Sequence, residues 1–175
     1  MTASVFIATS LDGFIARADG ALDWLPMGGE EDYGFYEFLG TVDAVVMGRK
    51  TFETVLSLGD AWPYGTKPVV VLSGRALALP AIPGAALERM SGDPRAIAEA
   101  LDHRGLRRVY VDGGDTIRRF LEAGLIERMT ITTVPVLLGV GIPLFGALTR
   151  DVELRHAGTV AYPSGLVRST YEVVS

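Results

Sequence analysis

Two adjacent glycines, Gly113 and Gly114, separate an apolar run at residues 109–111 from an amphipathic stretch that begins at Thr116. At the start of a helix, free backbone N–H groups and the positive end of the helix dipole attract anions, and glycine lets an anion come close to the backbone. The pair therefore predicts a phosphate site. A tight structural turn is the alternative interpretation.

Two other segments also place small or cationic residues directly after an apolar run. They are Gly48, Arg49 and Thr51 in "VVMGRKTF", and Ser73, Gly74 and Arg75 in "VVLSGR". Open α/β sheets bind ligands at the carboxyl ends of their strands, so we expect these residues to hold further phosphate oxygens. Taken singly, each arginine could equally be a solvated residue at the start of a helix or loop.

A carboxylate, Asp32, precedes the apolar residues Phe35, Tyr36 and Leu39, whose spacing predicts a helix over residues 30–39. If Asp32 faces an apolar cleft, burial raises its pKa and makes it a candidate acid or substrate anchor. Asp32 and the two glutamates before it also form the acidic first turn that a helix dipole favours. The residues alone favour this second, solvated interpretation.

The elements that must position these groups alternate along the chain of 175 residues, which we expect to form one domain over residues 1–175. We expect strands at 5–9, 43–47, 68–72, 86–88, 107–112 and 127–138, helices at 30–39, 49–57, 94–104 and 116–123, and final strands at 151–160 and 166–174. Residues 16–31, which include Gly28, predict a long irregular connection. The alternation predicts an α/β fold, with a mostly parallel sheet, helices on both faces and an antiparallel C-terminal hairpin.

The composition excludes several classes of function. A net charge of −5 argues against nucleic-acid binding, and the absence of cysteine excludes disulfides and thiolate metal sites. We expect no metal, because the two histidines, His103 and His156, share no ligand spacing. The sequence contains neither Gly-x-Gly-x-x-Gly nor a P-loop. It shows no membrane-spanning run and no signal peptide, so we expect a cytoplasmic protein.

Six motifs together resemble the dihydrofolate reductase-like superfamily, in particular its branch similar to the reductase of riboflavin biosynthesis. They are "VFIATSLDGFIA", "LDWL", "DAVVMGRKTFE", "PVVVLS", "VYVDGGDTIRRFL" and "ITTVPVLLGVGIPLF", in order over almost the whole chain. The resemblance implies a three-layer sandwich around a mostly parallel eight-stranded sheet. It also implies NADPH as hydride donor, bound in a cleft between the nucleotide-binding strand ends and the first helix.

The resemblance also implies roles for individual residues. The implied cofactor-binding residues are Ala8 and Ile15 at the nicotinamide; Gly48, Arg49, Lys50 and Thr51 at a phosphate-binding strand end and helix; Ser73, Gly74 and Arg75 at the 2′-phosphate; and Gly113, Gly114, Asp115 and Thr116 at the pyrophosphate turn. The implied substrate-side residues are Asp32, Tyr36, Thr132 and Trp24, with Asp32 orienting the substrate ring.

Our hypothesis from the sequence is an NADPH-dependent reductase that transfers hydride to a small pterin-like or ribosylaminopyrimidine-like molecule. One alternative is a true dihydrofolate reductase, in which Lys67 takes the place of the arginine that holds the substrate's glutamate carboxylate. Another is a non-catalytic nucleotide-binding module of the same fold. The expected partners are the small-molecule substrate and a second copy of the chain, with no nucleic acid and no membrane.

Overall fold

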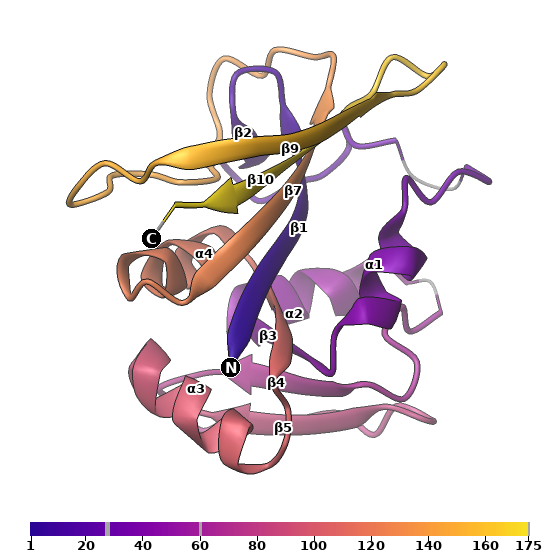
Figure 1. Cartoon of the computed structure of the whole chain (residues 1–175). Coiled ribbons are helices and arrows are strands. Elements are labelled where there is room, and N and C mark those ends of the chain that lie inside the picture. Colours follow the sequence, from indigo (N-terminus) through magenta and orange to yellow (C-terminus); the bar gives the residue numbers. More distant parts are fainter. Residues whose placement is uncertain (27–28, 60, 175) are drawn as a thin grey trace.

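The computed structural model describes residues 1–26, 29–59 and 61–174 (Figure 1). Along these ranges the chain forms, in order, β1 (Thr2–Ser10), β2 (Phe14–Ala16), α1 (Phe35–Thr41), β3 (Ala44–Gly48), α2 (Arg49–Ser57), β4 (Pro68–Leu72), β5 (Ala86–Met90), α3 (Pro94–His103), β6 (Arg108–Asp112), α4 (Gly114–Glu122), β7 (Ile126–Val134), β8 (Ile142–Pro143), β9 (Leu154–Ala161) and β10 (Val167–Val173). None of the described helices is long and apolar enough to cross a bilayer.

The central sheet has eight strands in the order β5-β4-β3-β6-β1-β7-β10-β9. The strands from β5 to β7 run parallel, and β10 and β9 add an antiparallel hairpin at the β7 edge. This arrangement confirms the fold predicted from the sequence. The Gly-rich segment after β7 adds one feature that was not expected, because Ile142 and Pro143 form β8 and pair with β2 in a second, small sheet.

Helices cover both faces of the sheet, because neighbouring strand residues point to opposite sides. Val46 packs in a core with residues of α3 and α4, whereas Val45 packs in a second core with residues of α1 and α2. Figure 1 shows the result, with α3 and α4 on one side of the strands and α1 on the other. Because these strands are buried on both faces, they appear in the sequence as unbroken apolar runs.

The first residue of α3 was predicted correctly from the sequence, and the first residue of α1 was not. Asp93 caps α3 as its sequence predicts, since its carboxylate accepts hydrogen bonds from the N–H groups of Arg95 and Ala96. The predicted start of α1 at residue 30 is wrong, because Tyr33 and Gly34 both have left-handed backbone conformations and the helix begins only at Phe35. The expected connection at residues 16–31 therefore extends to Gly34. Met27 and Gly28 lie outside the described residues.

Candidate active site

The central sheet opens between β1 and β6. β1 pairs with β6 through Thr2, Ala3 and Ser4, and pairs with β7 along most of its length. Beyond Ser4 the carboxyl-terminal parts of β1 and β6 diverge, and a cavity is lined by Phe6 of β1 and Tyr110 of β6. The strand pairing thus creates a hollow at the edge of the sheet where ligands bind in open α/β folds.

This cavity has a volume of about 1220 Å³. It exceeds the ~300–1,000 Å³ typical of a site for one small molecule, so it can take an extended ligand together with a second one. Ten of the thirteen residues assigned to the cofactor line it, namely Ala8, Ile15, Gly48, Arg49, Lys50, Thr51, Gly113, Gly114, Asp115 and Thr116. Segments far apart in the sequence are therefore brought to one place.

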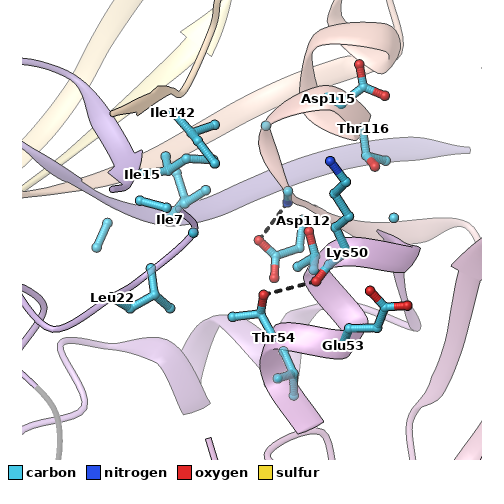
Figure 2. Close-up of a pocket in the computed structure, with 18 of the residues that line it drawn as sticks. Ile7, Ile15, Leu22, Lys50, Glu53, Thr54, Asp112, Asp115, Thr116 and Ile142 are labelled. Atoms are coloured by element: carbon cyan, nitrogen blue, oxygen red, sulfur yellow. Dashed lines mark hydrogen bonds between the residues drawn. The ribbon is translucent and has the colours of Figure 1, made fainter. Parts of the chain in front are cut away.

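Two helices begin at the cavity. α2 starts at Arg49 after Gly48, α4 starts at Gly114 after Gly113, and neither first turn has a side-chain cap. The N–H groups at the start of a helix have no partner inside the helix, and the helix dipole adds positive potential there. Two anion-attracting backbone ends therefore converge on one hollow, as Figure 2 shows with Lys50 from α2 and Thr116 from α4.

Both glycines of the β6–α4 turn are closely packed, and the backbone conformation of Gly113 also favours glycine. Gly113 has a φ of 92°, and a Cβ there would lie 2.2 Å from the Thr51 hydroxyl oxygen. A Cβ on Gly114 would lie 2.9 Å from Cδ1 of Ile15. This packing by itself accounts for the glycine pair, so the structural turn is real and the phosphate site stays a prediction.

The cations around the cavity differ in their partners. Arg49 forms an ion pair with Glu53 at 2.7 Å. Lys50 and Arg119 have no carboxylate within 4.0 Å among the described residues, and both line the cavity. These two side chains therefore supply positive charge that the described residues do not neutralise.

Asp112 is a cavity residue that the sequence analysis missed. It ends β6, its carboxylate accepts a 2.8 Å hydrogen bond from the N–H of Gly113, and Figure 2 shows it between the apolar and polar parts of the lining. Burial of the carboxyl raises its pKa from an ordinary value of 3.8 to about 6. The signal was present in "YVDGG", where an acid follows a buried strand, but only the glycines were used.

The structure agrees with the solvated interpretation of Asp32 and not with the one in which it faces an apolar cleft. Its carboxylate is exposed and accepts hydrogen bonds from the N–H groups of Gly34 and Tyr36, each at 3.0 Å. These bonds hold the pKa of Asp32 below its usual range, opposite to the effect of burial. Tyr36 is also 63% exposed, and neither residue lines the cavity. The carboxylate instead caps the turn that leads into α1.

Trp24 and Thr132 also lie outside the cavity lining, but each buries a polar atom. Thr132 is only 4% exposed and pairs in register with Ala8 of β1 and Arg168 of β10. Neither Trp24 Nε1 nor Thr132 Oγ1 has a hydrogen-bond partner among the described residues. Buried polar groups in proteins normally have a partner, so these two atoms mark positions where a polar ligand atom or water fits.

The residues expected at the 2′-phosphate do not all lie in one pocket. Ser73 and Gly74 line a separate pocket of about 170 Å³, whereas Arg75 is exposed and lines neither pocket. The Ser73 hydroxyl donates to the carbonyl oxygen of Arg75 at 2.9 Å and accepts from its N–H at 3.2 Å, which closes the turn after β4. The structure therefore does not bring the Arg75 side chain to the predicted site.

The family model of the RibD C-terminal domain matches residues 2–168. The chain belongs to this family. Its RibD C-terminal domain spans nearly the whole sequence and has the dihydrofolate reductase-like fold.

Relatives of this RibD C-terminal domain include reductases. The uncharacterized protein YwjB of Bacillus subtilis is 36% identical over 157 residues, which cover 89% of this chain and 88% of YwjB. The dihydrofolate reductase HdrB of Haloferax volcanii is 37% identical over 128 residues, which cover 70% of this chain and 62% of HdrB.

Solved structures share the fold along the whole chain. A protein of Shewanella sp. PV-4, named for riboflavin biosynthesis, is 40% identical, with a TM-score of 0.90 and complete coverage of both chains. The diaminohydroxyphosphoribosylaminopyrimidine deaminase/5-amino-6-(5-phosphoribosylamino)uracil reductase of Thermotoga maritima is 16% identical, with a TM-score of 0.75. That match covers 99% of this chain and 56% of the Thermotoga protein.

Proposed function

We propose that this RibD C-terminal domain is an NADPH-dependent reductase that transfers hydride to a small ribosylaminopyrimidine-like or pterin-like molecule. The observation that carries the proposal is the convergence of two helix N-termini without side-chain caps on a cavity large enough for a dinucleotide and a second ligand. Membership of a family with reductases among its relatives supports the same class of reaction.

The polar side of the cavity suits the phosphates of a dinucleotide. The first turns of α2 and α4 offer free N–H groups, and Lys50 and Arg119 offer positive charge. Gly113 and Gly114 line the cavity at the start of α4 and have no side chain that would stand between a ligand and the backbone. In this proposal these groups hold the pyrophosphate and fix the position of the rest of the cofactor.

The other side of the cavity suits flat aromatic rings. Figure 2 shows Ile7, Ile15, Leu22 and Ile142 gathered there, away from Lys50. Apolar walls exclude water and favour a close approach between the cofactor ring and a substrate ring. Bound NADPH would supply the hydride, and the protein would supply the alignment.

Reduction of a C=N or C=O bond needs a proton as well as a hydride. In our proposal the Asp112 carboxyl would deliver the proton to the substrate nitrogen or oxygen, while bound NADPH would supply the hydride to the carbon. A pKa of about 6 keeps part of the Asp112 population protonated near neutral pH. Asp32 is fully ionised there and exposed, so the proposal assigns the acid role to Asp112 instead.

Thermal unfolding with NADPH, with NADH and with neither tests cofactor binding. A ligand that binds only the folded state raises stability by about 2.7 kcal/mol at 100 times its Kd. We expect a clear shift with NADPH. If neither nucleotide shifts the transition at millimolar concentration, the proposal is wrong.

Turnover is then measured from NADPH absorbance with a ribosylaminopyrimidine and with dihydrofolate. Asp112→Asn should lower turnover by about 10²–10⁴-fold, the usual contribution of a general acid, without weakening NADPH binding. Asp32→Asn is the matched control, because it changes an exposed carboxylate outside the cavity lining, and its amide oxygen can keep one of the two backbone hydrogen bonds. NADPH binding without turnover of any substrate would favour the non-catalytic module.

A true dihydrofolate reductase is the second candidate, because HdrB is 37% identical over 70% of this chain. The structure gives Lys67 a different task from the one this alternative needs. Its ammonium group donates a 2.7 Å hydrogen bond to the carbonyl oxygen of Val42, and Lys67 does not line the cavity. Faster turnover of dihydrofolate than of the ribosylaminopyrimidine would select this candidate.

A homodimer stays a prediction from the sequence. Light scattering coupled to size-exclusion chromatography measures the mass in solution and decides it.

A further inference from the structure

Arg119 lies at the boundary between the two pockets. It lines the large cavity together with the start of α4, and it also lines the pocket of about 170 Å³ with Ser73, Gly74, Ser91 and Gly92. Arg119 and Leu72 are shared by both linings. A ligand that extends from the large cavity into the small pocket must therefore pass the Arg119 side chain.

The guanidinium of Arg119 is held in place without being neutralised. One of its nitrogens, Nη2, donates a 3.0 Å hydrogen bond to the carbonyl oxygen of Gly92, just beyond the end of β5. Its neighbour Arg118 instead pairs with Asp115 at 2.8 Å and Glu122 at 3.2 Å. Within the described part of the chain, no carboxylate lies within 4.0 Å of Arg119. Of these adjacent arginines, Arg119 is thus the one whose charge is available to a ligand.

The small pocket has the size and chemistry for one phosphate group. Its walls come from the ends of β4 and β5 and include Ser91, Gly74 and Ser73, whose hydroxyl is bonded to the backbone of Arg75. A guanidinium binds a phosphate through two parallel hydrogen bonds, which makes arginine well suited to such a pocket. Arg75, the cation expected here from the sequence, does not line it.

We propose that Arg119 selects NADPH over NADH by binding the 2′-phosphate of the cofactor in the pocket between the ends of β4 and β5. This inference rests on the proposed function for the cofactor and adds the residue that decides its specificity. The two nucleotides differ only in that phosphate. The loss of Arg119 should therefore weaken NADPH binding and leave NADH binding nearly unchanged.

The test uses four forms of the full chain: the wild type, Arg119→Gln, Arg118→Gln and Arg75→Gln. Isothermal titration gives the Kd of NADPH, of NADH and of 2′,5′-ADP, which carries the 2′-phosphate without the nicotinamide. We expect Arg119→Gln to raise the Kd of NADPH and of 2′,5′-ADP by about 10- to 100-fold, as for loss of a charged hydrogen bond. The Kd of NADH should change by less than about two-fold.

The control variants separate the alternatives. Arg118→Gln removes an adjacent positive charge on the same helix, and Arg75→Gln removes the cation that the sequence suggested, so both should keep the wild-type preference for NADPH. The inference is overturned if Arg119→Gln keeps that preference, if it weakens both nucleotides equally, or if Arg75→Gln abolishes the preference. Unfolding temperatures of all variants without ligand show that each is folded.

The same titrations separate this inference from the proposed reductase. If 2′,5′-ADP binds through Arg119 but no substrate is reduced, the pocket stands and the reductase proposal fails. If NADPH is oxidised by substrate with equal affinity in wild type and Arg119→Gln, the reductase stands and this inference fails. If wild type binds none of the three nucleotides, both are wrong.

Discussion

The Tyr110 hydroxyl donates a 2.8 Å hydrogen bond to the carbonyl oxygen of Phe6 across the opening between β6 and β1. Phe6 lies beyond the last residue of β1 that pairs with β6, so a side chain from β6 satisfies its carbonyl in place of a backbone N–H. Both residues line the cavity. The bond thus bridges the strands where they separate to form the candidate active site.

Removal of this bridge should weaken the fold. Tyr110→Phe keeps the ring, which packs edge-on against Phe38, but leaves the Phe6 carbonyl without its partner. We expect a loss of about 1–3 kcal/mol in the free energy of unfolding, the cost of an unsatisfied buried polar group. Urea denaturation measures it. Tyr171→Phe on β10 is the control, and an equal loss there would show that the bridge is not special.

The Asp112 carboxyl predicts a pH dependence of stability. Its pKa is raised from 3.8 to about 6, so the folded state binds this proton more tightly than the unfolded state does. The associated stability is fully present below pH 3.8 and is lost as the pH rises through about 6, by up to ~3 kcal/mol.

Asp112→Asn should therefore gain stability relative to wild type as the pH rises from 4 to 7. The asparagine oxygen can still accept the hydrogen bond from Gly113, and the difference between the two proteins cancels the titration of all other groups. Unfolding free energies at four pH values suffice. A constant difference across this range would show that folding does not raise the pKa of Asp112.

Gly113→Ala should be among the most damaging single changes at the cavity. It forces a side chain into a backbone with φ of 92° and places a Cβ 2.2 Å from the Thr51 hydroxyl. We expect a loss of at least about 2 kcal/mol, the sum of backbone strain and overpacking, together with weaker NADPH binding. The change should show in both urea denaturation and nucleotide titration.

Two further variants separate strain from collision. Gly139→Ala has a positive φ of 75° with no atom within 4 Å of the added Cβ, so it should cost only about 1 kcal/mol. Thr51→Ala combined with Gly113→Ala removes the colliding hydroxyl and should recover part of the lost stability. Equal costs for both alanine variants, with no recovery in the double variant, would rule out the collision.

Arg168 should control the turn that precedes α1. Its Nη1 donates a 2.7 Å hydrogen bond to the carbonyl oxygen of Tyr33, and a Cβ on Gly34 would lie 1.7 Å from that nitrogen. The next residue, Phe35, lines the cavity. Loss of the hydrogen bond from Arg168 should let Phe35 and the cavity wall that it forms move, because the left-handed conformation of Tyr33 is unfavourable without support.

Arg168→Gln is therefore expected to raise the KM for the reduced substrate by about 10-fold, as for loss of a charged hydrogen bond, with little change in the Kd of NADPH. Steady-state kinetics and nucleotide titration provide both values. Arg155→Gln serves as control, since Arg155 belongs to the same hairpin but pairs with Glu172 on the exposed edge. A matching rise in KM for both variants would contradict a specific role for Arg168.

The sequence by itself determined most of the helices and strands and which candidate binding residues follow each strand. The buried parallel strands appear in the sequence as apolar runs, and Asp93 indicates the start of α3. Gly113 and Gly114 indicate the turn before α4. These features depend on residues close together in the chain, so local patterns suffice to find them. The fold followed because alternating strands and helices allow few arrangements.

Only the tertiary structure decided which charged groups face the cavity. Asp32 is turned away by N–H groups of its own turn, whose shape is held by Arg168, 136 positions further along the chain. Arg119 rather than Arg75 reaches the small pocket because α4 packs beside the end of β5. Asp112 has a raised pKa because its carboxyl is desolvated in the folded chain. Side-chain direction and burial arise from contacts between distant segments, and no local pattern of residues encodes them.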